Sequence, residues 1–291
     1  MTDDKDDAHR PQISGYGLGS VDTVLSVDDV ARAAGDLGRD TPSATDLEAL
    51  IHGEPLVRLD GLVAGYGHME ILHAVDLRIG AGQSLCLIGP NGAGKSTILH
   101  AIYGFCRIFD GRIHIRDEDV TRMSPSQKLR RSGVAYILQD NSVFPDMTVE
   151  ENLLMGGFLL DRPAQAKAAA ERVFDRYDRL AQRRRQRAGV LSGGERRLLE
   201  ISRALIMEPD VLLVDEPSIG LEPRFIDMVF EILHDLQHIE GKTIIMVEQN
   251  AKKGLEFADI GYVLVSGRVA MADTGVHLLE DPEVGRLFLG G

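Results

Sequence analysis

The stretch Gly89-Pro90-Asn91-Gly92-Ala93-Gly94-Lys95-Ser96-Thr97 is the strongest indication of the fold in this sequence. It fits the phosphate-loop pattern G-x-x-x-x-G-K-[ST] at each fixed position. The preceding residues, 84–88, are expected to form a buried strand, and a helix is expected to begin near Gly94. The glycines allow consecutive backbone N–H groups to point at phosphate oxygens, and the helix N-terminus adds positive charge there. The stretch therefore predicts a nucleotide site in an α/β fold.

Three side chains of this phosphate loop are expected to divide the contacts with a nucleoside triphosphate. Lys95 supplies a positive charge for the β- and γ-phosphates, the Ser96 hydroxyl is a ligand for Mg²⁺, and Thr97 donates to the α-phosphate. The alternative is a glycine-rich turn without a ligand, which the Lys-Ser pair between a strand and a helix disfavours. All nine loop residues are therefore candidates for nucleotide binding, and Lys95 is also a catalytic candidate.

Two acids follow an apolar run at residues 211–214. This run, V-L-L-V, is typical of a central parallel strand that is covered on both faces. Asp215 and Glu216 then lie at the carboxyl edge of the sheet, where α/β proteins bind their ligands. Because neighbouring residues point to different sides, we expect Asp215 to hold Mg²⁺ and Glu216 to act as the base for the attacking water. A solvated turn is the alternative, which the following Pro217-Ser218 weakens.

The segment Leu191-Ser192-Gly193-Gly194-Glu195, named here the signature motif, is expected to start a helix. Its S-x-x-E spacing is typical of a capping box, and the helix N-terminus is then a receptor for a phosphate group. Within one chain the motif is expected to lie too far from Lys95 for both to hold one nucleotide. A capped helix without a ligand is the alternative.

The phosphate loop, the signature motif and the acid pair occur in the order typical of ATP-binding cassette (ABC) ATPases, which the chain resembles over about residues 56–291. The resemblance implies a RecA-like P-loop NTPase core with an antiparallel β-subdomain and an inserted helical subdomain, here at about 140–190. It also implies that Ser192, Gly193, Gly194 and Glu195 close on ATP held by a second ABC subunit, in a homodimer or a heterodimer. ATP and Mg²⁺ are the cofactors that the resemblance implies.

Four further residues take their roles from this resemblance. Tyr66 stands where the family stacks an aromatic ring on adenine, with a surface tyrosine as the alternative. Gln139 follows the strand expected at 134–138, and the resemblance makes it a ligand of Mg²⁺ and water. Gln249 replaces the usual switch histidine and is expected to hydrogen-bond the γ-phosphate. Glu222 departs from the more common aspartate at a contact with the second subunit.

Local patterns predict several elements around these motifs. Strands are expected at 56–59, 61–64 and 71–79 in the β-subdomain. One helix is expected throughout 163–180, and the run R-R-R-Q-R at 183–187 is typical of a solvated helix face without a functional role. The inserted segment has neither a long coiled coil nor a cysteine-zinc module, which favours the transporter branch of the family.

Composition and sequence patterns indicate the cellular compartment of the protein. No apolar stretch approaches the length that spans a bilayer, and no cationic and apolar signal stands at the N-terminus. Cys86 and Cys106 have no metal-binding spacing and fit a reducing compartment. We therefore expect the protein to lie in the cytosol. The cassette has no basic stripe of the kind that nucleic-acid binding needs.

The first 54 residues are expected to form an acidic, largely disordered leader in front of an ABC ATPase domain at 55–291. They contain twelve acids and four Lys or Arg, which places −8 of the net charge of −13 in this segment. A short amphipathic helix is expected near 46–52. A solvating tail is favoured over a regulatory or partner-binding segment.

Three short segments indicate the cargo. V-E-Q-N at 247–250, S-I-G-L-E-P at 218–223 and L-F-L-G-G at 287–291 are similar to the subfamily that imports branched-chain and other hydrophobic amino acids. We therefore expect an ATPase subunit docked on permease subunits at the cytoplasmic face of the cell membrane, served indirectly by a substrate-binding protein. The alternatives are another cargo, such as urea, short amides or exported lipopolysaccharide, a soluble ABC ATPase outside transport and, more weakly, a nucleic-acid-handling ATPase.

Overall fold

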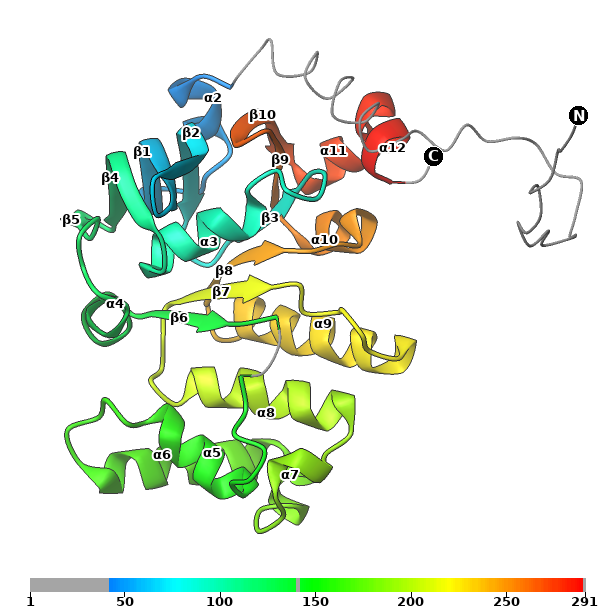
Figure 1. Ribbon diagram of the computed structural model, residues 1–291. Coiled ribbons are helices and arrows are strands. Elements are labelled where there is room, and N and C mark those ends of the chain that lie inside the picture. Colours follow the sequence, from blue (N-terminus) through cyan, green and yellow to red (C-terminus); the bar gives the residue numbers. More distant parts are fainter. Residues whose placement is uncertain (1–41, 140–141, 290–291) are drawn as a thin grey trace, which may run out of the picture.

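The computed structural model describes residues 42–139 and 142–289, which form two sheets and a group of helices (Figure 1). The larger sheet has six strands in the order β10-β9-β3-β8-β7-β6. Five of its strands run parallel, and β10 pairs antiparallel with β9. The bounds of these strands are β3 Ser84–Ile88, β6 Val134–Ile137, β7 Val211–Asp215, β8 Thr243–Val247, β9 Ile260–Val265 and β10 Arg268–Thr274.

Apolar side chains fill both faces of this larger sheet. Every residue of β3 is buried, as predicted, and so is every residue of β7, β8 and β9. Leu85 and Leu87 pack into the core shared with the smaller sheet, whereas Cys86 and Ile88 pack into the core on the opposite face. Because β3, β6, β7 and β8 are parallel, the residues that follow them meet at one edge of the sheet.

The smaller sheet is antiparallel, with the strand order β2-β1-β4-β5, and it confirms the predicted β-subdomain. Residues 56–59 and 61–64 were expected to form separate strands, but they belong to one strand. The strand continues through Gly61, whose φ is 54°, because its pairing with the neighbouring strand shifts register between Leu59 and Leu62 and so accommodates the irregularity. The bounds are β1 Pro55–Tyr66, β2 Met69–Gly80, β4 Arg107–Ile115 and β5 Glu118–Asp119.

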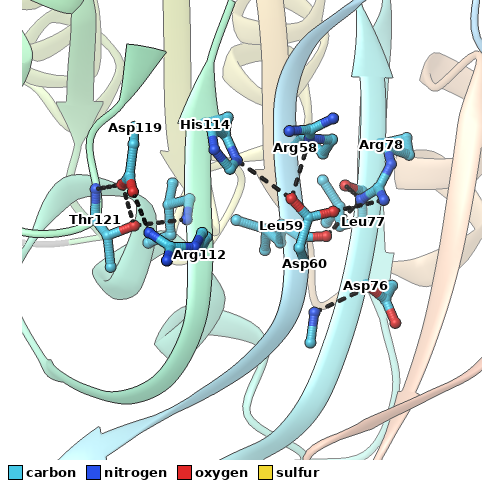
Figure 2. Close-up of polar contacts among 12 residues, drawn as sticks. Arg58, Leu59, Asp60, Asp76, Leu77, Arg78, Arg112, His114, Asp119 and Thr121 are labelled. Carbon is cyan, nitrogen blue, oxygen red and sulfur yellow. Dashed lines mark hydrogen bonds and ion pairs between the residues drawn. The ribbon is translucent and has the colours of Figure 1, made fainter. Parts of the chain in front are cut away.

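Asp60 of β1 connects three strands of the smaller sheet through polar contacts (Figure 2). Its carboxylate accepts a hydrogen bond from Arg78 of β2 at 2.7 Å and pairs with Arg58 at 3.0 Å. His114 of β4 lies 3.2 Å from the second carboxylate oxygen. Arg78 is almost fully buried, so this pairing satisfies a charge inside the sheet that carries Tyr66 at the end of β1.

Helices cover both faces of the larger sheet. The helix after the phosphate loop, α3, packs in the core shared with the smaller sheet, and α9 and α10 pack in the opposite core. Within the described part of the chain, no helix is both long and apolar enough to cross a membrane. The helices outside the insertion are α2 Ala44–Ala49, α3 Lys95–Tyr103, α4 Pro125–Ser132, α9 Pro223–His238, α10 Ala251–Phe257, α11 Gly275–Glu280 and α12 Pro282–Phe288.

The inserted helical subdomain lies between β6 and β7 in the sequence. Figure 1 shows α5, α6 and α7 gathered below α8, on the side away from the smaller sheet. The Thr148 side chain and Glu151 form a capping box at the start of α5. The elements of the insertion are α5 Val149–Gly156, α6 Pro163–Arg176, α7 Asp178–Gln182, the 3₁₀ helix η1 Ala188–Val190 and α8 Gly193–Leu205.

The prediction of one helix throughout 163–180 was wrong, because the chain breaks at Tyr177. Tyr177 leaves the helical region with φ −123° and ψ 87°, and its N–H closes α6 on the carbonyl of Val173. Its own carbonyl then accepts bonds from Leu180 and Ala181, which starts α7. The arginines at 183–185 follow α7 in a turn, so they do not form the expected helix face.

The helix predicted near 46–52 is present as α2, two residues earlier in the sequence. Leu47 is only 1% exposed and packs in the core of the smaller sheet. Gln83, at the start of the larger sheet, donates to the carbonyl of Leu50 at 3.2 Å and accepts from the N–H of His52 at 3.1 Å. The last part of the predicted leader therefore packs on the folded chain, whereas residues 1–41 lie outside the described residues.

Candidate functional site

The phosphate loop joins the buried strand β3 to α3, as predicted. Gly89 has a φ of 142°, and a Cβ there would lie 2.1 Å from the carbonyl oxygen of Leu264, so only glycine fits. Gly94, with a φ of 100°, is the N-cap of α3. The Lys95 ammonium donates to the carbonyls of Gly89 and Pro90 at 2.8 and 3.0 Å, which holds it across the mouth of the loop.

A depression of about 300 Å³ lies over this loop. It is lined by six residues of the phosphate loop together with Tyr66, Ile71 and Glu216. Burial lowers the pKa of the Lys95 ammonium, whereas Glu216 and Asp215 oppose that shift. A helix N-terminus with a lysine across the loop binds polyphosphate anions. The residues around this depression therefore fit a nucleoside triphosphate.

Asp215 is held by two hydroxyl groups at the end of β7. Its Oδ1 accepts from the Ser96 hydroxyl at 3.0 Å, and its Oδ2 accepts from the Tyr136 hydroxyl at 2.8 Å. Burial and the charge of Asp215 raise the pKa of Tyr136, so this phenol remains a donor. A hydroxyl beside a carboxylate is a set of hard oxygen atoms of the kind that suits Mg²⁺, and the role of Ser96 and Asp215 toward that ion stays a prediction. The sequence reasoning missed Tyr136, which lies in β6.

Glu216 faces a different neighbour from Asp215. Its backbone has a φ of 43°, an uncommon value for a residue with a side chain, and its N–H donates to the carbonyl of Val247 in β8 at 2.9 Å. The side-chain amide of Gln139, which follows β6, donates to Glu216 Oε2 at 3.0 Å. The structure therefore brings together two residues that were predicted separately, beside the depression above Lys95.

Tyr66 also lines this depression. The residue is 44% exposed, and its hydroxyl is hydrogen-bonded to Nδ1 of His100 on α3. The imidazole of His100 contacts the rings of Phe105 and Tyr136 edge to face, at 5.9 and 5.8 Å between centroids. An exposed aromatic ring whose hydroxyl is held by a packed side chain is suited to stacking on a base. No signal in the sequence pointed to His100.

The signature motif starts α8 with the predicted capping box. The Ser192 side chain accepts from the backbone of Glu195, and the Glu195 carboxylate accepts from Ser192 at 3.0 Å. Arg183 pairs with Glu195 at 2.6 Å, which gives one of the arginines at 183–187 a structural contact. A Cβ at Gly194 would lie 2.1 Å from the ring of Phe225 on α9, so this glycine allows the two helices to approach closely.

The signature motif does not line the depression over the phosphate loop. Ser192 and Gly193 are exposed at the N-terminus of α8, and Gly193 instead lines a second pocket of about 320 Å³ with Gln139, Arg197 and Glu216. We name these two places the phosphate-loop half-site and the signature half-site; that each completes a site with a second subunit stays a prediction.

Comparison with known proteins gives the family. The family model described as ABC transporter matches residues 72–219. BraG, a high-affinity branched-chain amino acid transport ATP-binding protein of Pseudomonas aeruginosa, is 42% identical over 236 residues, which are 81% of this chain and 100% of that protein. This chain belongs to the ABC transporter ATPase family. Its members hydrolyse ATP, so the protein is an ATPase.

Two further similarities bear on the fold and the cargo. A crystal structure of the ADP conformation of an ATP-binding cassette of an ABC transporter matches with a TM-score of 0.71 and 27% identity. The match covers 82% of this chain and 100% of that one. LptB, a lipopolysaccharide export system ATP-binding protein of Haemophilus influenzae, is 29% identical over 81% of this chain and 97% of that protein. The RecA-like cassette fold that was predicted is therefore confirmed.

Two predicted residues of the cassette stand apart from the phosphate-loop site. Gln249 follows β8 with an exposed side chain, which makes no hydrogen bond to any described residue. Glu222 is the N-cap residue of α9 without a side-chain cap bond, and it pairs with Arg224 at 3.1 Å. The structure leaves both residues at the surface, so their roles toward nucleotide and partner stay predictions.

Proposed function

We propose that this ATPase powers the uptake of branched-chain and other hydrophobic amino acids through partner permease subunits in the cell membrane. The observation that carries the proposal is the similarity to BraG, which extends over 100% of that protein and is higher than the similarity to LptB, at 42% against 29% identity. The V-E-Q-N and S-I-G-L-E-P segments support the same cargo class.

Within this proposal, the residues around the depression bind and orient the substrate ATP. Backbone N–H groups of the phosphate loop and the Lys95 ammonium hold the phosphates, and the Tyr66 ring stacks on adenine. Ser96 and Asp215, with Gln139, hold Mg²⁺, which when bound neutralises charge on the β- and γ-phosphates. The hydrogen bond that Tyr136 donates to Asp215 fixes one carboxylate oxygen, so the other stays directed toward Ser96.

Glu216 is the proposed general base. Its carboxylate lies at the edge of the depression that Lys95 lines, and the bond from Gln139 fixes its orientation. A water between this carboxylate and the γ-phosphate gives up its proton to Glu216 as its oxygen attacks the γ-phosphorus, and the bond from that phosphorus to the bridging oxygen breaks, which releases ADP and phosphate. Gln249 donates a hydrogen bond to a γ-phosphate oxygen in the same proposal, without adding a positive charge.

The signature motif completes the site of a second subunit. Its exposed helix N-terminus, at Ser192 and Gly193, is suited to bind the γ-phosphate of an ATP held by another cassette. We propose a dimer of this chain with itself or with a related ATPase, at the cytoplasmic face of the membrane. Closure of the dimer moves the helical subdomain, and this movement is passed to the permeases, which a substrate-binding protein supplies with cargo.

Uptake in the native cell tests the proposed cargo. We expect deletion of the gene to lower the initial rate of leucine, isoleucine and valine uptake, and the wild-type gene but not Glu216→Gln to restore it. The tagged protein should also co-purify from membranes with permeases that have several spanning helices. Unchanged leucine uptake together with lost transport of urea, short amides or lipopolysaccharide would exclude this cargo, and capture only in a soluble complex would exclude transport.

A further inference from the structure

We infer that Arg197 is a positioning residue that links the signature helix α8 to the pair formed by Gln139 and Glu216. This inference rests on the proposed roles of that pair in ATP hydrolysis. Arg197 lies on α8, only 4% exposed, two residues after the end of the signature motif. A fully buried arginine requires partners for its charge and its donors, so its contacts indicate what it holds in place.

The guanidinium of Arg197 reaches the ends of two neighbouring strands. Its Nη1 donates to the carbonyl of Leu138 at 2.7 Å, directly after β6. Its Nη2 lies 3.4 Å from the carbonyl of Asp215, the last residue of β7. Leu138 immediately precedes Gln139 and Asp215 immediately precedes Glu216 in the sequence. One side chain thus holds the backbone from which both members of the Gln139–Glu216 hydrogen bond emerge.

Glu200 supplies the charge that keeps this guanidinium inside the protein. Its carboxylate lies one turn further along α8, 6% exposed, and accepts from Arg197 Nη1 at 2.9 Å. A buried ion pair brings little net stability, because desolvation of both charges opposes their attraction. The planar guanidinium of Arg197 does allow its two Nη groups to reach different acceptors, which a lysine ammonium on a flexible stem does less well. The pair therefore contributes geometry more than stability.

Helix α8 would couple the contact with a second subunit to the position of the catalytic side chains. Ser192 and Arg197 belong to one rigid helix, so a shift of the signature motif against a second subunit also shifts the guanidinium. That shift moves the carbonyls of Leu138 and Asp215, and with them the side chains of Gln139 and Glu216. Closure of the signature half-site on one ATP would then set the catalytic pair of the same chain, which acts on the other ATP.

The test uses a double variant, Arg197→Gln with Glu200→Gln, which removes both charges and leaves no buried carboxylate unpaired. We expect kcat for ATP to fall by about tenfold to a hundredfold, the scale of a misplacement near one ångström. The dissociation constant for a fluorescent ATP analogue should stay within about twofold, because the phosphate loop is untouched. Hydrogen exchange in peptides covering Gln139 and Glu216 should become faster. Arg197→Lys should restore part of kcat.

A matched control is the exposed ion pair between Arg172 and Glu208 in the same subdomain. The double variant Arg172→Gln with Glu208→Gln removes the same groups at a place that touches neither strand end, and it should keep wild-type kcat and exchange. Wild-type kcat and exchange in the Arg197 and Glu200 variant, or an equal loss of nucleotide affinity, would overturn the inference. Glu216→Gln, measured alongside, separates the two proposals, because turnover retained there contradicts the assigned base instead.

Discussion

The phosphate-loop half-site and the signature half-site of this ATPase are built in different ways. At the phosphate loop, side chains from distant parts of the sequence meet, as in the bonds from Ser96 and Tyr136 to Asp215. At the signature motif, the polar contacts are between residues closer in the sequence, because Ser192 and Glu195 cap each other and Arg183, twelve positions earlier, pairs with Glu195. The first half-site is an open depression lined by groups from several segments, whereas the second is an exposed helix end.

This difference supports the proposal that a single chain is not a complete enzyme. The phosphate-loop half-site has a positive charge suited to the phosphates of ATP and oxygen atoms suited to Mg²⁺. Among the described residues, its depression has no contribution from the signature motif. The signature half-site has an exposed helix N-terminus that favours an anion, and the pocket that Gly193 lines there is shared with Glu216 of the same chain but has no phosphate-loop residue in its described lining. In that proposal, a second subunit places one half-site against the other and supplies what each lacks. The following predictions test this division between the two half-sites.

Glu216→Gln should have the largest effect, because it removes the proposed base and keeps the shape of the side chain. We expect ATP turnover to fall by two or more orders of magnitude, roughly the effect of losing a key transition-state group. ATP binding should remain, since Lys95 and the loop amides are unchanged. Steady-state ATPase and nucleotide binding are the measurements. Near-normal turnover would show that the catalytic base lies elsewhere.

Gly194→Ala should separate the two half-sites, with a smaller effect. The new Cβ would lie 2.1 Å from the Phe225 ring, so the start of α8 must move away from α9. We expect kcat to fall by about tenfold, as for a misplaced binding group, with ATP affinity of the isolated subunit unchanged. Phe225→Leu in the same chain should recover part of kcat by opening space. A loss of nucleotide affinity equal to the loss of kcat would mean that the half-sites are not independent.

Tyr66→Ala should have the smallest effect and act only on the phosphate-loop half-site. Loss of the ring should weaken ATP binding by about 1 kcal/mol, or about fivefold, the usual worth of an aromatic contact. Tyr66→Phe keeps the ring and loses only the bond to His100, so its affinity should lie close to wild type. Titration with ATP measures both variants. Equal weakening by the two substitutions would show that the hydroxyl, and not the stacking ring, contributes the binding energy.

The contrast between the half-sites also explains what could be predicted from the sequence. The phosphate loop, the capping box at Ser192 and the strands β3, β7 and β8 depend on neighbouring residues, so short patterns revealed them. The contacts that Tyr136, His100 and Arg197 make depend on packing between segments far apart in the chain. Tyr136 reaches Asp215 over 79 positions, and no local pattern indicates such a pair. The break at Tyr177 was missed for a related reason, because an alanine-rich helical pattern continues through it.

A mixing experiment with two inactive variants tests most directly whether the site is shared between two copies. Lys95→Ala disables the phosphate-loop half-site, and Ser192→Asp places a negative charge at the signature half-site while remaining a good helix cap. In a mixed dimer, the intact phosphate loop of one copy meets the intact signature motif of the other. We predict that an equimolar mixture recovers ATPase activity, to at most about a quarter of wild type, because half of the randomly paired dimers contain one intact site of two and the damaged signature motif of the chain that supplies the base weakens the coupling through Arg197. A mixture as inactive as either variant alone would contradict a site completed by a second copy of this chain.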